Sequence, residues 1–244
     1  MTAIARSVRE GILLAVGATL FAVMTFAWGL AALVLAILLP ARAGRRAGRL
    51  GAMWGFRIYL GIMQALGAWR LDLEELDALR GQGALIVAPN HPCLLDAVLV
   101  VSRLPDAVCV MKRSLLGNFL LGPAARLARY VRNDSLLRLV STAETQLREG
   151  GQLVLFPEGT RTVAPPTGPF TDAVGAVARR ANVPVQTVII EADSAFLGKG
   201  RPLLDRPRFP VHYRARLGRR FEAPSDVRAF TAELESYFAN HLRG

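Results

Sequence analysis

Cysteine is scarce in this 244-residue chain, and a familiar hydrolase motif is missing from it. Cys93 and Cys109 are the only cysteines, and neither stands at a metal-ligand spacing, so we predict no metal site and no resident cofactor. The serine elbow G-x-S-x-G does not occur, which removes the usual serine-nucleophile mechanism. No internal repeat is visible, and the length suits one sizeable α/β domain with a further segment attached.

Acidic residues are also few, with 19 Asp and Glu against 30 Lys and Arg and a formal net charge of +11. Residues 1–70 contain eight arginines but only one acidic residue, Glu10. A nucleic-acid-binding protein would interleave aromatic residues with its basic face or carry a recognisable module, and the sequence shows neither. Because the basic residues border an apolar run, we predict that the chain binds an anionic membrane and no nucleic acid.

Residues 11–39 form a run of 29 residues without a charged side chain. As a helix this run would be about 43 Å long, which exceeds the roughly 30 Å hydrocarbon core of a bilayer. A tilted, kinked or re-entrant helix therefore fits as well as a simple span, whereas a cleaved signal peptide would be shorter. An arginine cluster from Arg42 to Arg49 follows. The positive-inside rule then places the rest of the chain on the cytoplasmic side of a bacterial-type inner membrane, where both thiols would be reduced.

A second apolar stretch, Leu50 to Trp69, contains Arg57, which makes a full membrane span unfavourable. Trp54 suits the headgroup level of a membrane, so we predict an interfacial helix, with an ordinary core helix as the open alternative. The chain then divides into N-terminal membrane-anchoring helices, residues 1–70, and a second part, residues 71–244.

Beyond residue 70, short apolar runs alternate with amphipathic stretches. This alternation predicts a single α/β domain, with a mostly parallel mixed sheet flanked by helices, after the N-terminal membrane-associated helices. We expect a short strand near residue 71 and further strands over 84–88, 108–111, 130–131, 153–156, 183–191 and 211–217. We expect helices over 97–102, 113–126 (in two pieces), 136–148 and 172–181, and a final helix from Pro224 and Ser225. Loops are expected over 162–169 and 194–210.

The first candidate site is the segment Asn90-His91-Pro92-Cys93-Leu94-Leu95-Asp96, which follows the strand predicted over 84–88. The carboxyl end of a strand usually faces the ligand in an α/β sheet. Pro92 suits the first position of a helix, so His91 would lie in the turn and Asp96 could reach back to one imidazole nitrogen. The carboxylate would fix the tautomer and leave the other nitrogen as a general base. A helix-capping histidine beside a solvated aspartate is the alternative.

The second candidate site is Pro157-Glu158-Gly159-Thr160-Arg161, which follows the strand predicted over 153–156. Gly159 would allow the backbone to approach a ligand closely. Two strand ends in one sheet would direct His91, Asp96, Glu158 and Arg161 towards one crevice. A local ion pair between Glu158 and Arg161 on a loop is the alternative.

These segments resemble the two signatures of the glycerolipid (lysophospholipid) acyltransferase family, which includes the 1-acylglycerol-3-phosphate O-acyltransferases. Residues 90–96 are similar to its N-H-x-x-x-x-D block, and F-P-E-G-T-R over 156–161 is similar to its second signature. The spacing of 67 residues between His91 and Glu158 also suits the family, and the resemblance extends from about Leu50 to Phe221. It implies a membrane-bound enzyme that moves a fatty acyl group from an acyl carrier protein or coenzyme A thioester to a hydroxyl or amine of a lipid acceptor.

The resemblance also implies a role for each residue of the two segments. His91 would be the general base, oriented by Asp96, and residues 71–244 would form the acyltransferase domain. Backbone N–H groups near Gly159 would be candidates for binding the oxyanion. The implied substrate-binding residues are Lys112, Glu158, Gly159, Thr160 and Arg161.

Three positions depart from the family pattern. The arginine expected after the strand near Val131 is displaced to Arg132 or absent, Thr171 stands where a lysine commonly follows Phe170, and Thr187 replaces the second proline of the last block. The first two changes remove or move cations that would meet an acceptor phosphate, so we hypothesise an acceptor other than lysophosphatidate. Residues 191–194 and 197–200 resemble an offshoot subgroup that accompanies specialised bacterial lipid pathways such as aryl polyene synthesis.

Two other functions remain open from the sequence. A thioesterase or other hydrolase could use the same His–Asp pair with water as the acceptor. An inactive membrane scaffold could keep the fold, although the presence of both His91 and Asp96 disfavours it. Cys93 lies close enough to His91 to be considered as a thiolate nucleophile, but the family uses no covalent cysteine, so we predict a small packing residue.

Overall fold

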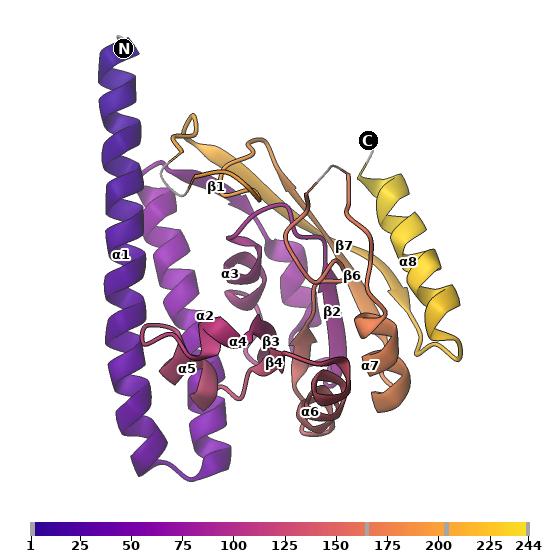
Figure 1. Ribbon diagram of the computed structural model, residues 1–244. Coiled ribbons are helices and arrows are strands. Elements are labelled where there is room, and N and C mark those ends of the chain that lie inside the picture. The colour runs from indigo at the N-terminus through magenta and orange to yellow at the C-terminus, as the bar shows by residue number, and fades with distance from the viewer. Residues whose placement is uncertain (1–2, 164–165, 203–204, 243–244) are drawn as a thin grey trace.

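The computed structural model describes residues 3–163, 166–202 and 205–242. At its centre is a seven-stranded sheet in the order β1-β7-β6-β2-β5-β3-β4 (Figure 1). Neighbouring strands are parallel except for β6 and β7, which are antiparallel, so the predicted α/β fold is confirmed. The strands are β1 (Trp69–Asp72), β2 (Leu85–Pro89), β3 (Ala107–Lys112), β4 (Val131–Asn133), β5 (Gln152–Val154), β6 (Val185–Ala192) and β7 (Val211–Phe221).

Helices cover both faces of the sheet, which explains the continuous apolar runs of its central strands. In β2, Leu85 and Val87 face a core formed with α2 and α3, whereas Ile86 and Ala88 face a core formed with α6, α7 and α8. The helices are α1 (Ala3–Leu38), α2 (Ala41–Ala65), α3 (Asp96–Val101), α4 (Arg113–Leu116), α5 (Gly122–Leu127), α6 (Leu136–Arg148), α7 (Ala173–Ala181), α8 (Val227–His241) and the 3-10 helix η1 (Glu74–Leu79).

The second N-terminal helix begins earlier than the sequence predicts. Pro40 separates α1 from α2, and α2 starts at Ala41 rather than Leu50, because the arginine cluster lies inside the helix with Gly48 and Arg49 packed inward. One side of α2 belongs to the core, where Met63 is buried. Its other side exposes apolar residues such as Trp54. The helix therefore combines the two alternatives left open by the sequence.

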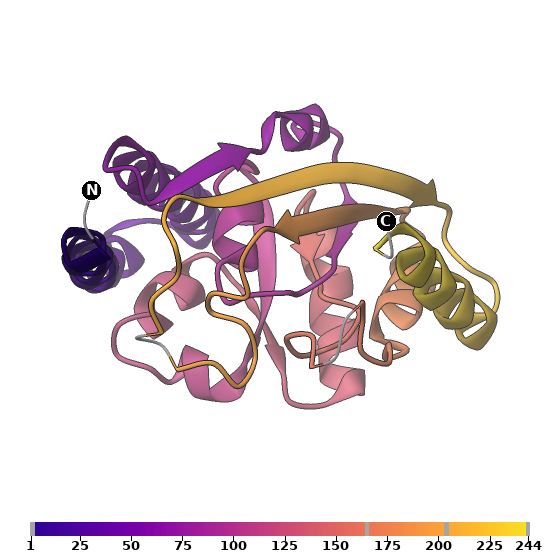
Figure 2. The ribbon, with the colours of Figure 1, turned by 90° about the horizontal axis from the view of Figure 1, so that it is seen from above.

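Helix α1 lies along the side of the sheet domain rather than projecting away from it (Figures 1 and 2). It packs on α2 and α5, and the ring of Phe21 contacts those of Phe56 and Tyr59. In the described part of the chain, this is the one helix long and apolar enough to cross a membrane by length and composition.

Some element boundaries differ from the predicted ones. Pro92 does not begin a helix; α3 starts at Asp96, whose side chain holds the preceding turn by accepting a hydrogen bond from the Cys93 N–H. The last helix starts at Val227 because Asp226 caps it by accepting hydrogen bonds from the first N–H groups. β1 begins at Trp69, so residues 69 and 70 pair with β7.

Other boundaries lie where the sequence predicts them. α6 occupies residues 136–148, and the predicted break between two helical pieces separates α4 from α5. The expected loops over 162–169 and 194–210 contain no helix or strand in their described residues. Residues 164–165 and 203–204 of these loops lie outside the described ranges.

Candidate active site

The two predicted segments lie at the same edge of the sheet. β2 and β5 are neighbouring parallel strands, and their carboxyl ends lead directly into residues 90–96 and 155–161. The second segment is bonded to the first, because the N–H of Thr162 donates to the carbonyl of His91 at 2.8 Å. The structure therefore brings the segments together, as expected for the carboxyl ends of parallel strands.

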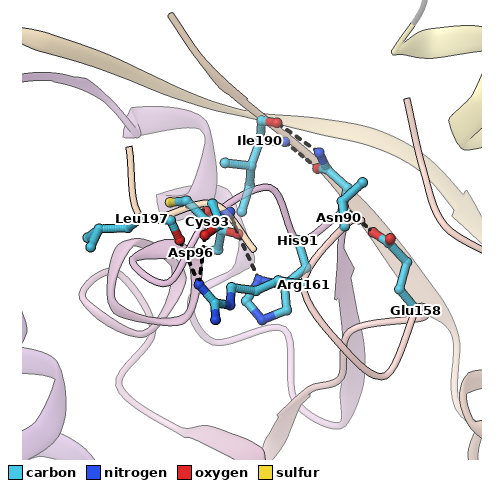
Figure 3. A network of polar contacts seen from close by, with 10 residues as sticks. Asn90, His91, Cys93, Asp96, Glu158, Arg161, Ile190 and Leu197 are labelled. Carbon is cyan, nitrogen blue, oxygen red and sulfur yellow. Dashed lines mark hydrogen bonds and ion pairs between the residues drawn. The ribbon is translucent and has the colours of Figure 1, made fainter. Parts of the chain in front are cut away.

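His91 and Asp96 form a direct pair (Figure 3). Nδ1 of His91 lies 2.8 Å from Oδ2 of Asp96. The Asp96 side chain is fully buried, which excludes a solvated aspartate, and the His91 side chain is 16% exposed. An ionised Asp96 accepts the Nδ1–H, which selects the tautomer whose Nε2 has a free lone pair.

Phe156, the residue before the second segment, fixes the plane of the imidazole. Its ring stacks on that of His91 with centroids 3.9 Å apart and an interplanar angle of 22°. The hydrogen bond to Asp96 fixes the ring's rotation within that plane. Together the two contacts give Nε2 a fixed direction.

Asp96 also accepts two hydrogen bonds from Cys93. The Cys93 N–H donates to Oδ2 at 2.8 Å, and its thiol donates to Oδ1 at 3.0 Å. Burial raises the pKa of the Cys93 thiol well above its usual range, so the group stays protonated and can donate. Burial raises the pKa of Asp96 as well, and the hydrogen bonds from His91 and Cys93 oppose that effect. Cys93 is buried as a packing residue would be, and it contacts the carboxylate too.

Asn90 sets the point at which the chain leaves β2. Its side-chain Nδ2 donates to the carbonyl of Ile190 at 2.9 Å, and its Oδ1 accepts from the Ile190 N–H at 2.6 Å. This two-way bond joins the end of β2 to β6 immediately before His91. The sequence did not assign this role, and the only available signal was the position of Asn90 next to His91.

Glu158 is buried, and both of its oxygens are used within its own loop. Oε1 accepts from the hydroxyl of Thr162 at 2.7 Å, and Oε2 accepts from the N–H of Gly168 at 2.8 Å. In the view of Figure 3, Glu158 lies on the opposite side of His91 from Asp96. The described residues show no ion pair between Glu158 and Arg161. Glu158 thus organises the loop after β5. Its predicted role in binding the acceptor stays a prediction.

Arg161 joins the second segment to the loop that follows β6. Its Nη1 donates to the carbonyls of Leu197 and Gly198 at 2.9 and 3.1 Å. The Leu197 carbonyl also accepts from the N–H of Leu94 at 3.1 Å. Arg161 (Figure 3) and Leu94 thereby hold this loop against the segment that contains His91 and Asp96.

The backbone around Gly159 decides which amides remain available. Gly159 has a φ of +65°, a left-handed conformation that favours glycine, and its N–H donates to the Phe156 carbonyl at 3.0 Å. That N–H is therefore not a free oxyanion donor. In the part of the chain that the structure describes, the N–H groups of Thr160 and Arg161 have no protein acceptor. They replace Gly159 as the candidate donors.

Lys112 is not brought into contact with His91. It is the last residue of β3, it is exposed, and its register partner on β4 is Asn133. β5 separates β3 from β2, so Lys112 shares the carboxyl edge of the sheet with His91 but lies two strands away. Arg132, the displaced arginine, follows on β4 and forms an ion pair with Asp134.

Comparison with known proteins shows which family this chain belongs to. A family model described as Acyltransferase matches residues 70–191, half of the chain, including both segments. The chain belongs to the Acyltransferase family.

Two proteins illustrate the similarity to other acyltransferases. A Caenorhabditis elegans protein with the provisional name 1-acyl-sn-glycerol-3-phosphate acyltransferase acl-1 is 26% identical over 148 residues, which are 58% of this chain and 56% of that protein. The chain therefore spans little more than half the length of this relative. The crystal structure of the 1-acyl-sn-glycerophosphate (LPA) acyltransferase PlsC from Thermotoga maritima matches with a TM-score of 0.76 and 18% identity, covering 98% of this chain and 96% of that one.

The fold match extends beyond the Acyltransferase match at both ends. The family model begins in β1 and ends in β6, so it contains the candidate site. The fold match also covers nearly all of α1, α2, β7 and α8. The N-terminal helix pair is thus part of the shared fold.

Proposed function

We propose that the chain is a membrane-associated acyltransferase that transfers a fatty acyl group from a thioester to a hydroxyl or amine of a lipid acceptor. The 2.8 Å contact between His91 Nδ1 and Asp96 is the observation that carries the proposal. With Nδ1 committed to a buried carboxylate, Nε2 is the nitrogen that can take a proton from the acceptor. The thioester belongs to acyl carrier protein or coenzyme A, the two donors that the family resemblance implies.

The reaction needs one proton shuttle and no covalent enzyme intermediate. Nε2 of His91 takes the proton from the acceptor hydroxyl as its oxygen attacks the thioester carbonyl, and Asp96 stabilises the imidazolium. When the tetrahedral intermediate collapses, the new C–O bond remains, the C–S bond breaks, and the imidazolium returns its proton to the leaving thiolate. The free N–H groups of Thr160 and Arg161 are the proposed donors to the oxyanion.

Apolar surface favours an orientation in which α1 lies against the membrane along its length. A helix packed beside the sheet domain cannot cross a bilayer upright without carrying that domain into the hydrocarbon. Exposed apolar residues occur along the whole of α1, and Leu94, within the His91 segment, is 51% exposed. In the proposed orientation, the exposed Leu94 is available to bring the His91 segment close to lipid.

The similar proteins favour a lysophosphatidate-type acceptor. Both carry names of acyltransferases that act on 1-acyl-sn-glycerol 3-phosphate. Lys112 and the displaced Arg132 lie at the carboxyl edge of the sheet, so cations exist there, although Arg132 is paired with Asp134. We therefore propose a lysophospholipid with a phosphate group as the acceptor, and the sequence-based hypothesis of a phosphate-free acceptor is the alternative outcome of the test.

The test offers purified protein one acyl thioester with lysophosphatidate and, in parallel, with phosphate-free lysolipids. Acylated product and free fatty acid are both measured, since free acid alone would indicate a hydrolase. His91→Ala is expected to lower kcat/KM by about 10²–10⁴-fold, and Asp96→Asn by a similar factor through the wrong tautomer. The matched control is His212→Ala, because His212 is an exposed histidine on β7. Wild-type turnover by folded His91→Ala would disprove the general-base role.

A further inference from the structure

A cavity lies at the other end of the sheet from the candidate active site. Its volume is about 640 Å³, and it is lined by the start of α2, by Arg129 just beyond α5 and by the end of α6. α6 leads into the amino end of β5, whereas the active-site segment follows the carboxyl end of that strand. We call it the arginine cavity, because Arg42, Arg45, Arg129 and Arg148 line it.

The arginine cavity carries an excess of positive charge. Glu149 is the one carboxylate among its lining residues, and it forms an ion pair with Arg45. Arg148 pairs with Glu144 at 2.7 Å. The side chains of Arg42 and Arg129 have no hydrogen-bond or ion-pair partner among the described residues. Two guanidinium groups are therefore available to an anion.

The backbone at Arg129 is unusual for such a residue. Its φ is +60°, in the left-handed region that suits glycine or asparagine at the end of a helix. An arginine in this conformation is uncommon, and strain of this kind occurs most often where it serves a function. Arg129 adds a second free guanidinium group to the cavity, beside that of Arg42 from α2.

The walls of the cavity are fastened together by Arg49. This arginine is 3% exposed, its Nη2 donates to Oε1 of Gln146 at 2.8 Å, and its Nε donates to the carbonyl of Ala128 at 3.4 Å. It thus joins α2 to α6 and to the end of α5. Arg49 therefore stabilises the fold. The arginine cluster from Arg42 to Arg49, predicted from the sequence to meet lipid, thus contains arginines that hold the fold together and others that are free to bind an anion.

The cavity lies next to the apolar end of α1. Ile37 and Leu38 are 85% and 70% exposed, and they precede the first α2 residues of the cavity wall by only a few positions. A charged cavity beside exposed aliphatic side chains matches a phospholipid, whose phosphate lies just outside its hydrocarbon. Arginine binds phosphate well because its planar fork donates two parallel hydrogen bonds.

We propose that the arginine cavity binds the phosphate group of an anionic phospholipid, with the acyl chains lying towards the exposed end of α1. The proposal rests on the proposed membrane association and is independent of acyl transfer. Arg42 and Arg129 make the direct contacts, and Arg45 and Arg148 add to the positive potential. The occupant is a structural lipid of the membrane, bound apart from the acceptor in the active site.

The test measures equilibrium binding of the full-length protein to phosphatidylcholine vesicles with and without phosphatidylglycerol. The double variant Arg42→Ala/Arg129→Ala should weaken binding to the anionic vesicles by about a hundredfold, because two charge-assisted hydrogen bonds are lost. The matched control is Arg179→Ala/Arg228→Ala, which removes the same charge from exposed arginines on α7 and α8. The control should change binding by less than about fivefold, since it alters only the long-range attraction.

Equal losses in the two double variants would overturn the proposal, as would unchanged binding of Arg42→Ala/Arg129→Ala. Calorimetry with inorganic phosphate adds a third arm. Phosphate binding that disappears in this variant while vesicle binding persists would make the cavity a site for a soluble phosphate and would reject the lipid. Acyl transfer is measured in neutral detergent micelles in parallel. If the protein is inactive but the two double variants still differ in vesicle binding as expected, the result would count against the proposed reaction and support lipid binding in the arginine cavity.

Discussion

At the scale of single residues, the proposed chemistry requires a charged Asp96, although burial raises the pKa of this carboxyl group. A buried carboxylate needs hydrogen bonds to remain ionised, and Asp96 receives three from His91 and Cys93. Its Oδ1 receives only the Cys93 thiol among the described contacts. Cys93 is thereby a positioning residue for the His91–Asp96 pair. The sequence could not show this role, because it does not reveal whether a cysteine only fills space or also donates a hydrogen bond.

Replacing Cys93 should shift the pH dependence of acyl transfer. The thiol hydrogen bond lowers the pKa of Asp96, so Cys93→Ala removes that effect and leaves a carboxylate with a higher proton affinity. A higher pKa of Asp96 moves the acidic limb of the kcat/KM profile to higher pH, which a rate measurement across pH detects.

Cys93→Ser is the matched comparison for this experiment. A hydroxyl keeps the donor, so the acidic limb should return towards its wild-type position even if the smaller side chain lowers kcat. A purely structural cysteine would give lower rates with an unmoved acidic limb in Cys93→Ala. That result would reject the positioning role.

At the scale of helices, α2 joins the N-terminal pair to the sheet domain through close backbone approaches. A Cβ at Gly48 would lie 2.5 Å from the backbone N of Ala128, and a Cβ at Gly51 would lie 2.0 Å from the Trp28 ring of α1. α5 and α1 therefore reach α2 only because these positions lack side chains. In the sequence, the arginines around Gly48 indicate an exposed segment rather than a packed helix. The predicted start of the helix at Leu50 was therefore wrong.

Gly48→Ala should destabilise the protein although alanine is the better helix former. The backbone at the end of α5 cannot yield as a flexible side chain would, so overpacking is expected to cost about 1–3 kcal/mol of unfolding free energy. Denaturant unfolding in detergent measures the change. Gly55→Ala is the control, because a Cβ there meets nothing within 4 Å, and it should stabilise the helix by up to about 1 kcal/mol. Equal stability of the two variants would show that the α2–α5 contact is loose.

At the scale of the whole molecule, the proposed membrane association depends on the apolar surface of α1. Most of this helix is uncovered although one narrow side packs on α2 and α5. Because the helix lies beside the α/β domain (Figure 2), the proposal is that the protein attaches to a membrane along that side.

Polar substitution of the exposed α1 surface should release the protein from vesicles without unfolding it. The variant Val23→Gln/Leu30→Gln/Val34→Gln changes side chains that are 58%, 50% and 55% exposed. Each aliphatic side chain contributes roughly 1.5–3 kcal/mol when it enters hydrocarbon, so neutral-vesicle binding should fall by at least about a thousandfold. Flotation with phosphatidylcholine vesicles measures this loss.

The control for this prediction changes exposed apolar residues elsewhere. Leu136→Gln/Leu137→Gln/Val163→Gln alters exposed apolar side chains on α6 and in the loop after β5. These lie away from α1, so binding should change little. A comparable loss in both triple variants would show that the membrane contact is diffuse and does not follow α1.

The sequence by itself determined most of the local elements and the candidate reacting groups of this protein. Apolar runs predicted most of the sheet because both faces of a parallel sheet are buried, and His91 and Asp96 were predicted as a pair because five residues separate them across one turn. Short-range patterns suffice for both, since the interacting groups are close in the chain.

Only the tertiary structure decided the partners that come from distant parts of the chain. That Glu158 and Arg161 meet substrate stays a prediction; the structure adds that Glu158 closes its own loop and that Arg161 holds residues 197–198. The arginine cavity likewise gathers Arg42, Arg129 and Arg148 from three helical regions. A polar side chain bonds to whichever donor or acceptor packing brings within about 3 Å, and sequence spacing does not encode that distance.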